Sequence, residues 1–321
     1  MSANKEVVLV TGATGLVGNG IRLALESDYG AKYRKYEWLF VGSQQLNLLD
    51  KQATLAYFRE KRPVYVIHLA ARVGGLYSNM SDNNGFLLDN LNINLNVLDA
   101  AFQCKVKRLI SCMTSCIFPD KITYPITEEK LHLGPPHDSN YGYAHAKRLL
   151  EVMSRSYNEK YNTQFVTVIP TNVFGPHDNY NLENAHVLPA LIHKAYLAKQ
   201  EKKPLLVAGS GKPLRQFIYS VDLGKLFLWT LFEYKDVSSI ILSVPEADEI
   251  SIADAARAIA HHMGLEQGIK ITNEGADGQF KKTACNSKLM QLNPTFQFTP
   301  FDDAMKHACD WFVENYSVAR K

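Results

Sequence analysis

Residues 7–18 read VVLVTGATGLVG, and this stretch decides the fold. Its first four residues are apolar and mostly β-branched, which predicts a strand buried on both faces, as in a parallel sheet. Glycines follow at positions 12, 15 and 18, and a helical pattern then continues through Leu25. In a strand–turn–helix context, glycines permit a tight turn and let the backbone approach a pyrophosphate. Gly12, Gly15 and Gly18 are therefore predicted to place a diphosphate at the amino end of the helix.

Strand and helix patterns alternate from this turn to residue 170. Strands are predicted at residues 7–10, 38–41, 64–69, 108–112, 165–169 and 240–244, and helices at 55–61, 90–102, 143–161, 189–199 and 222–234. Such alternation predicts an α/β fold with a doubly wound parallel sheet of the Rossmann type. Two helices around a basic, loop-rich middle are expected after Ile252. We predict a dinucleotide-binding domain (1–172 and 220–245) and a smaller substrate lobe (173–219 and 246–321).

Composition excludes several classes of protein. The 321 residues carry a net charge of only +3, too little for a nucleic-acid-binding surface. No apolar run approaches the roughly 20 residues of a membrane span, and the strand at Val7 leaves no room for a signal peptide. Five cysteines without a CxxC pair fit a reducing cytoplasm. Metal-ligand spacing is absent, and the neighbouring His261 and His262 are expected at the surface. We expect a cytoplasmic protein without metal, membrane or nucleic-acid partner.

The end of the second strand bears on the choice of cofactor. Proteins that bind NAD usually place a carboxylate there for the ribose 2′-hydroxyl. Here the strand ends Val41-Gly-Ser-Gln44, with no acid, so the space is predicted to take the 2′-phosphate of NADP(H). No arginine follows this strand, which leaves the contacts of that phosphate open.

Tyr143 and Lys147 form a YxxxK pair on a predicted helix. Residues four apart share a helix face, so the ammonium is expected to lower the pKa of the Tyr143 hydroxyl from about 10. The tyrosine can then exchange a proton at an oxygen while hydride moves at the attached carbon. A surface tyrosine–lysine pair is the plain alternative. Thr114 and Ser115, which end the preceding strand, favour the catalytic interpretation.

Several strings, taken together, carry a family resemblance. They are the glycine turn, HLAA at 68–71, Thr114-Ser115, the YxxxK pair and PTNVFGP at 170–176. These resemble the extended short-chain dehydrogenases/reductases across nearly the whole chain. Within that family, longer strings are similar to the GDP-L-fucose synthases: SCIFP at 115–119, NVFGPHDN at 172–179, HVLP at 186–189 and GSGKPLR at 209–215. The resemblance implies 3,5-epimerisation and NADPH-dependent 4-reduction of GDP-4-keto-6-deoxy-D-mannose, in a homodimer formed through two helices of each large domain.

The resemblance also implies roles for individual residues. A 4-keto group acidifies the C–H bonds at C3 and C5, and inversion there needs a base on one face and an acid on the other. Cys116 and His186 are implied for these roles, with Tyr143 as the proton donor at the C4 oxygen. Lys147 supports Tyr143, and the Thr114 hydroxyl bonds the same oxygen. By spacing alone, a cysteine beside a buried strand is an ordinary core residue and a lone histidine is structural.

Further contacts are implied by the same resemblance. Those with the cofactor are Gly12, Gly15, Leu16, Gly18, Asn47, Leu48, Ala70, Tyr143, Lys147, Pro170, Asn172, Val173 and His186. Those with the substrate are Asn172, Lys194, Arg215 and Lys282, since cations and amides pair with a diphosphate. The pair Lys281-Lys282 fits solvated surface charge equally well. Thr14 stands where some family members carry an arginine. Cys104, Cys112, Cys285 and Cys309 are expected to be structural.

Two other functions remain open at this point. Nucleotide-sugar 4,6-dehydratases resemble this chain as far as a Thr-x-Glu at the end of the fourth strand. Here the order is Thr114-Ser115-Cys116, and a thiol is a poor substitute for the acid that releases water. A non-catalytic dinucleotide-binding protein on the same fold is the third candidate. Such proteins typically lose the tyrosine or the lysine, whereas Tyr143 and Lys147 are both present.

Overall fold

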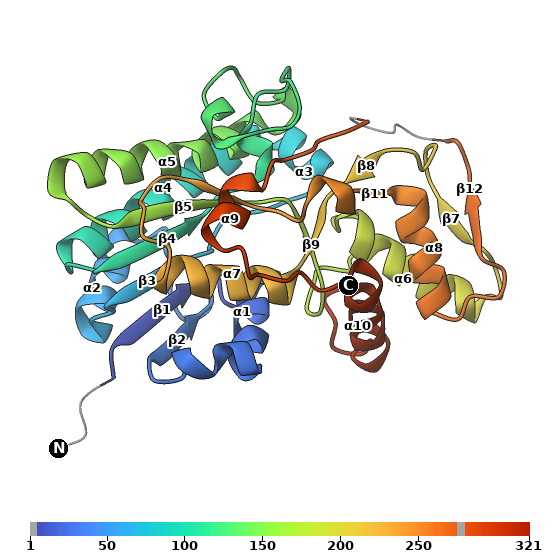
Figure 1. Ribbon diagram of the computed structural model, residues 1–321, viewed down its shortest axis with the longest axis horizontal. Helices are drawn as coiled ribbons and strands as arrows, with labels where there is room; N and C mark the ends of the chain where they lie inside the picture. Colours follow the sequence, from blue (N-terminus) through green and yellow to red (C-terminus); the bar gives the residue numbers. More distant parts are fainter. Residues whose placement is uncertain (1–4, 275–279) are drawn as a thin grey trace.

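The computed structural model describes residues 5–274 and 280–321, apart from the side chains of residues 76 and 77. Six parallel strands form the central sheet in the order β10-β5-β4-β3-β1-β2 (Figure 1). They are β1 (Val7–Thr11), β2 (Glu37–Val41), β3 (Tyr65–His68), β4 (Arg108–Cys112), β5 (Phe165–Pro170) and β10 (Ile240–Leu242). The predicted α/β class and parallel sheet are confirmed.

Helices cover both faces of this sheet. On one side α1 packs against α7, and on the other α4 packs against α5 and α2 (Figure 1). Their bounds are α1 (Leu16–Glu26), α2 (Lys51–Lys61), α4 (Asn83–Gln103), α5 (Tyr141–Tyr161) and α7 (Ser220–Phe232). Short connections are η1 (Asp28–Tyr33), α3 (Leu76–Ser81), η2 (Ser115–Ile117), η3 (Glu128–Lys130) and η4 (Asp138–Asn140). We call this sheet with its helices the sheet module.

The strand order reverses between β1 and β3, because the chain leaves β1 for β2 on one side and returns to β3 on the other. Open α/β sheets bind ligands beyond the carboxyl ends of their strands at such a reversal. The register aligns Thr11 with His68 and His68 with Ser111 at these ends. The fold therefore directs the glycine turn and the ends of β3 and β4 toward one place.

A second group of elements has its own apolar core and is here called the helical module. Its core is built around α6 (Val187–Gln200), α8 (Ile252–His262) and α10 (Phe301–Glu314). Paired short strands complete it: β6 (Asn172–Phe174) with β9 (Phe217–Tyr219), β7 (Leu205–Val207) with β12 (Ile269–Ile271), and β8 (Leu214–Arg215) with β11 (Ile250–Ser251). Two short helices lie outside this core: η5 (Glu246–Asp248), and α9 (Ser287–Leu292), whose Leu289 packs in the core of the sheet module.

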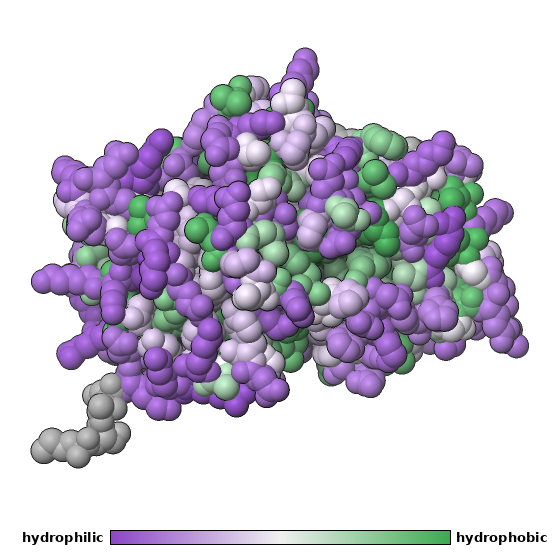
Figure 2. Space-filling view, in the orientation of Figure 1, coloured by the Kyte–Doolittle hydropathy of each residue, from purple (hydrophilic) through white to green (hydrophobic). Residues whose placement is uncertain are grey.

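The surface of the molecule is mostly hydrophilic on the face shown in Figure 2, with hydrophobic side chains gathered near the middle of that face. Within the described residues, no helix is both long enough and apolar enough to cross a membrane.

Three local expectations differ from the structure. The described residues of the segment from Ile252 onward form three helices rather than two, because the six-residue α9 packs near β10. Helix α4 begins at Asn83, seven residues before the predicted start, because the Asp82 side chain caps it by accepting a hydrogen bond from the Gly85 amide at 2.9 Å. His262 was expected at the surface, but its side chain is 9% exposed and pairs with Asp302 at 2.9 Å.

Candidate active site

The glycine turn has the geometry that a diphosphate site requires. Gly12 has φ +67°, and a Cβ there would lie 2.6 Å from the Ala70 amide nitrogen. At Gly18 a Cβ would lie 2.5 Å from the Ala13 carbonyl oxygen, so only glycine lets α1 pack this closely. Gly15 is less crowded, because a Cβ there would lie 3.4 Å from its nearest neighbour, the Gly12 carbonyl oxygen. Within the described part of the chain, no side chain caps the amino end of α1, which leaves the amides of its first turn free to meet an anion.

The loop that follows β2 lies beside this turn. Ser43, Gln44 and Asn47 are exposed, whereas Leu48 is buried. Asn96 on α4 is buried and donates hydrogen bonds to the carbonyl oxygens of Leu48 at 2.9 Å and Leu49 at 3.2 Å. Asn96 thus fixes a loop predicted to line the cofactor site.

Lys147 is buried at the base of the site. Its side chain is 2% exposed, and its Nζ donates a hydrogen bond to the carbonyl oxygen of Cys112 at 2.9 Å. Burial lowers the pKa of the Lys147 ammonium. A buried cation without a carboxylate partner is costly, and proteins keep such groups mainly at functional sites. The position of Lys147 supports the catalytic interpretation of the YxxxK pair over a surface pair.

Tyr143 lies one helical turn before Lys147, close to two thiols. Burial is the main cause that raises the pKa of the Tyr143 hydroxyl, and the ionisable thiols of Cys116 and Cys112 raise it further. This direction is opposite to the one expected from the ammonium of Lys147, because burial disfavours the charged phenolate. A high pKa keeps Tyr143 protonated, as a proton donor must be. Helix α5 also packs against η2, the short helix that contains Cys116, so Cys116 and Tyr143 lie in one region.

Thr114 and Cys116 occupy the short turn after β4. The Thr114 Oγ1 caps η2 by accepting a hydrogen bond from the Cys116 amide at 3.4 Å. Both side chains are partly exposed, in contrast to Cys112, where burial raises the pKa of the thiol to about 11. Cys112 is therefore an inert core thiol, as predicted, whereas Cys116 is open to solvent.

A buried polar chain behind Lys147 was missed at the level of sequence. The His68 ring bonds Thr11 Oγ1 through Nδ1 at 2.9 Å and Asn94 Oδ1 through Nε2 at 3.2 Å. Asn94 in turn donates to the Ala146 carbonyl oxygen at 3.1 Å. Burial, with the positive charge of Lys147, lowers the pKa of His68 to about 3. The available signal was the run of asparagines at positions 90, 92, 94 and 96 on one predicted helix.

Comparison with known proteins supports the same interpretation. The model of the NAD dependent epimerase/dehydratase family matches residues 8–243. The chain belongs to this family. It is 50% identical to the GDP-L-fucose synthase of Dictyostelium discoideum, covering 100% of this chain and 99% of that protein. It is 44% identical to the probable GDP-L-fucose synthase of Drosophila melanogaster, covering 98% and 99%.

A solved structure agrees with these relatives. The crystal structure of a GDP-L-fucose synthetase from Naegleria fowleri bound to NADP superimposes with a TM-score of 0.95 at 49% identity, covering 99% of this chain and 96% of that one. The resemblance found in the motifs is confirmed, and this epimerase/dehydratase chain groups with proteins named GDP-L-fucose synthase.

In the helical module of this family member, His186 precedes α6. Its side chain is open to solvent, and partial desolvation by the surrounding protein lowers the pKa of the imidazole. His186 is the N-cap residue of α6. Among the described residues no side chain, including the His186 ring, makes a capping hydrogen bond at this end of the helix. Lys194 lies further along α6 and is exposed.

Arg215 lies on β8 and makes no ion pair with any described residue. Its Nη1 donates to the Leu214 carbonyl oxygen at 2.7 Å, and its charge interacts with Tyr124 and Glu249. Gln216 beside it is 1% exposed and bonds both backbone groups of Ala284, at 2.7 and 3.0 Å. This pairing draws the segment of Lys282 alongside Arg215, although 67 positions separate the two residues in the chain.

The adjacent lysines of the segment differ in their contacts. Lys281 Nζ pairs with Glu246 at 2.7 Å and Glu249 at 3.4 Å. Lys282 forms no ion pair within the described part of the chain and is only partly exposed. The sequence alone did not distinguish the two lysines. In the structure Lys281 forms ion pairs, whereas Lys282 forms none with the described residues.

The last predicted contacts lie where the chain passes from β5 to β6. Pro170 is buried and ends β5, and Val173 is partly buried. Asn172 is exposed at the start of β6, and its Nδ2 donates to the Gln216 carbonyl oxygen at 3.1 Å. Through Gln216, Asn172 is tied to the strand region of Arg215, on the side of the sheet's carboxyl ends.

Proposed function

We propose that this chain is a bifunctional NADPH-dependent epimerase and reductase that converts GDP-4-keto-6-deoxy-D-mannose to GDP-L-fucose. The observation that carries the proposal is the buried Lys147, which bonds the Cys112 carbonyl oxygen one helical turn from Tyr143, with Cys116 on the turn after the same strand. Reduction needs a proton donor on a supporting cation, and epimerisation needs a nearby group that exchanges carbon-bound protons. The relatives named GDP-L-fucose synthase favour this activity over dehydration.

The glycine turn fits NADP(H). The backbone at Gly12 and Gly18 leaves no space for side chains, while Gly15 and the uncapped amides of α1 stay open for a diphosphate. Ser43 and Gln44, both exposed after β2, add no carboxylate that would repel a 2′-phosphate. Asn47, Leu48 and Ala70 are proposed to line the adenosine half. When bound, NADPH supplies the hydride that is transferred to C4 of the sugar.

Tyr143 is the proposed proton donor in the reduction. Its raised pKa keeps the hydroxyl protonated at neutral pH, and transfer of that proton to the C4 oxygen accompanies formation of the C4–H bond. Lys147, held by the Cys112 carbonyl, stabilises the phenolate that remains. Thr114 donates a hydrogen bond to the same oxygen and orients the carbonyl.

Cys116 and His186 are the proposed acid and base of epimerisation. They belong to different modules, and we propose that they approach the bound sugar from two directions. One group removes the proton at C3 or C5, the 4-keto group delocalises the resulting charge, and the other group returns a proton on the opposite face. The lowered pKa of His186 keeps its imidazole neutral, as a base must be.

Arg215 and Lys282 are proposed to bind the GDP diphosphate, with Lys194 and Asn172 beside them. Gln216 bonds the backbone of Ala284, which brings the segment of Lys282 near that of Arg215, and neither cation forms an ion pair with a described residue. Charge-assisted hydrogen bonds to phosphate are about twice as strong as neutral ones. Binding of the diphosphate here would set the sugar between the two modules.

The proposal extends to organisation and setting. We propose a cofactor domain (1–172 and 220–245) and a nucleotide-sugar lobe (173–219 and 246–321). The separate cores of the two modules support this division, although Ile218, Ala284, Leu289 and Phe296 of the proposed lobe pack in the cores of the sheet module. A homodimer through α4 and α5 is supported by Leu88, Leu95 and Leu149, which these helices expose. Its sedimentation as twice the chain mass would test it. All five cysteines are free, which supports a cytoplasmic setting.

The central experiment is direct. Purified protein is incubated with GDP-4-keto-6-deoxy-D-mannose and NADPH, and the product is identified by NMR and mass spectrometry. GDP-L-fucose is expected, with kcat/KM for NADPH above that for NADH because no carboxylate follows β2. Recovery of unreduced 4-keto sugar, or a preference for NADH, would contradict the proposal.

A further inference from the structure

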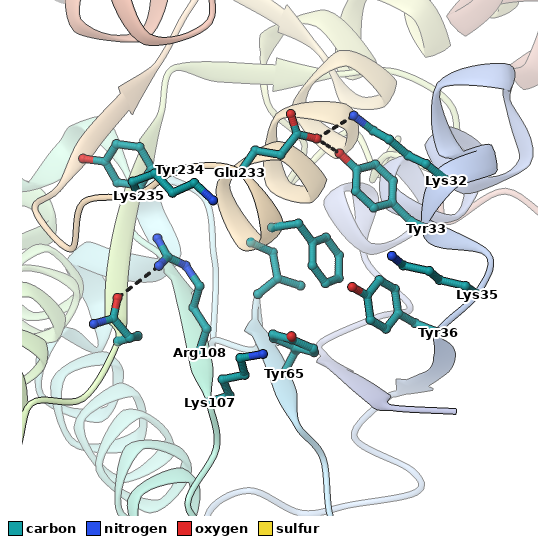
Figure 3. A pocket seen from close by; sticks show the side chains of 13 residues that line it. Lys32, Tyr33, Lys35, Tyr36, Tyr65, Lys107, Arg108, Glu233, Tyr234 and Lys235 are labelled. Carbon is teal, nitrogen blue, oxygen red and sulfur yellow. Dashed lines mark hydrogen bonds and ion pairs between the residues drawn. The ribbon is translucent and has the colours of Figure 1, made fainter. Parts of the chain in front are cut away.

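A cavity lies at the amino edge of the sheet, away from the candidate active site. Its lining includes Tyr65 and Arg108, the first residues of β3 and β4, together with Phe232 at the end of α7 (Figure 3). Lys147 bonds Cys112, the last residue of β4, and at about 3.3 Å per residue the two ends of this strand lie about 13 Å apart. The volume is about 540 Å³, within the range of about 300–1,000 Å³ usual for small-molecule sites.

Positive charge dominates this cavity. The lining cations are Lys32, Lys35, Lys107, Arg108 and Lys235. Among the described lining residues the one carboxylate is Glu233, which is already engaged by Lys32 at 2.5 Å and by the hydroxyl of Tyr33. The other four cations form no ion pair within residues 5–274 and 280–321. Such an unbalanced cluster attracts an anion.

Nearby negative charge does not cancel this excess. Glu6 interacts electrostatically with Lys107, and Asp236 with Arg108, but neither carboxylate lines the cavity. The carboxyl end of α7 adds about half a negative charge. Arg108 donates hydrogen bonds to the Asp236 carbonyl oxygen at 2.9 Å and to Gln164 Oε1 at 3.2 Å, and neither of these acceptors is a carboxylate.

Stacked aromatic rings form the other part of the lining. The Phe232 ring lies 4.5 Å from Tyr36 at 12° and 5.1 Å from Tyr33 at 21°, and Tyr65 meets it edge-on at 5.1 Å. Tyr33 and Tyr65 are buried, whereas Tyr36 and Phe232 remain partly exposed. Figure 3 shows Arg108, Lys107 and Lys235 on one side of the space and Tyr33 and Tyr36 on the other. Ring faces opposite cations suit a ligand that is planar at one end and anionic at the other.

We propose that this cavity is a second ligand site, which binds a nucleoside phosphate. The base lies against Tyr36 and Phe232, and the phosphate lies among Lys107, Arg108 and Lys235. Arg108 is suited to a phosphate because the guanidinium presents several donors in one plane. The site is separate from the dinucleotide turn, since it lies at the opposite end of the same strands.

AMP is the probe for this proposal, with inorganic phosphate as the anion without a base. Isothermal titration calorimetry measures both, with and without saturating NADPH and GDP. AMP is expected to bind the enzyme with equal affinity in both conditions and about tenfold or more tighter than phosphate, because a base stacked on a ring adds that much. The charge-reversed variant Lys107→Glu with Lys235→Glu is expected to bind AMP at least about tenfold more weakly.

A matched control is Lys202→Glu with Lys270→Glu, which changes the net charge equally at exposed positions of the helical module. It is expected to bind AMP as the wild type does. Tyr36→Leu tests the aromatic ring separately from the positive charge. This variant should bind AMP more weakly and bind phosphate as the wild type does. The proposal is overturned if AMP produces no heat, if NADPH and GDP displace it, or if the charge-reversed variant and its control bind AMP equally. Unchanged NADPH affinity verifies that each variant is folded.

Discussion

The two modules present their candidate catalytic residues in opposite ways. In the sheet module, Lys147 is buried and bonded to Cys112, and burial raises the pKa of Tyr143 beside it. In the helical module, His186 is open to solvent, and neither Arg215 nor Lys282 has an ion-pair partner among the described residues. The sheet module is organised before substrate arrives, whereas the helical module leaves its charges unpaired for a ligand.

This difference has a physical reason. Groups that act on protons need a fixed geometry and a tuned pKa, which buried hydrogen bonds on rigid strands and helices supply. A cationic side chain that is already paired with a protein carboxylate is less available to bind a diphosphate. Lys281 shows the contrast, because it is paired with Glu246 and lies next to unpaired Lys282. Substitutions in the sheet module should therefore lower the rate of a chemical step, whereas substitutions of Arg215 and Lys282 in the helical module should mainly raise KM.

The largest effect is expected in the sheet module, for Tyr143→Phe. Removing the hydroxyl should lower the kcat of reduction by about 10²–10⁴-fold, the usual contribution of a positioned acid. Exchange of the C3 and C5 protons with solvent should survive, since Cys116 and His186 remain. Reduction is followed through NADPH absorbance and exchange through mass spectrometry in D₂O. Equal loss of both activities would show that the two steps do not use separate residues.

Cys116→Ser should produce the reverse pattern. A hydroxyl is a far weaker acid than a thiol, so deuterium incorporation at C3 and C5 should fall by about 10²-fold or more. Remaining reduction should act on unepimerised sugar and give a 6-deoxy product of altered stereochemistry. His186→Asn should impair inversion similarly.

Cys285→Ser is the control for that experiment, because Cys285 is a partly exposed thiol bonded to Ser287 at 3.1 Å. Normal exchange and normal product from Cys116→Ser would assign Cys116 to the structure rather than to the chemistry.

The helical module is tested by Arg215→Met and Lys282→Met. Each should raise KM for the GDP sugar by about ten- to a hundredfold with a smaller change in kcat, because hydrogen bonds to charged groups contribute about 1.5–3 kcal/mol. Lys281→Met is the matched control, since Lys281 pairs with Glu246 and Glu249, and its KM should change less than about threefold. Initial rates at varied substrate distinguish the variants. A larger effect at Lys281 than at Lys282 would reverse the assignment.

The smallest effect concerns stability and compares two histidines. The pKa of His68 in the folded state is about 3, below the unfolded value of about 6.5. Between these values the unfolded chain binds a proton that the folded chain does not, so the free energy of unfolding falls as pH falls. The slope from this group approaches about 1.4 kcal/mol per pH unit. His68→Gln should flatten it more than His186→Gln does, because His68 is fully buried whereas the His186 side chain is exposed.

Urea unfolding at pH 6.5, 5.5 and 4.5 measures this slope for each variant. If the curve of His68→Gln runs parallel to that of the wild type, the buried His68 is not a source of acid sensitivity.

The sequence alone determined the order of the elements and most of the site in the sheet module. Apolar β-branched runs predicted the strands because parallel strands are buried on both faces, and the glycine spacing predicted the turn because backbone packing there excludes side chains. Tyr143 and Lys147 were predictable because four residues span one helical turn. These relations are local, so neighbouring residues carry them.

Only the tertiary structure decided the rest. The pKa direction of Tyr143, the buried chain from His68 to Asn94, and the different contacts of Lys281 and Lys282 depend on groups that are distant in the chain. The amino-edge cavity likewise gathers residues from η1, β3, β4 and α7, none of which forms a motif by itself. Desolvation and charge pairing depend on three-dimensional neighbours, and periodicity in the sequence does not record them.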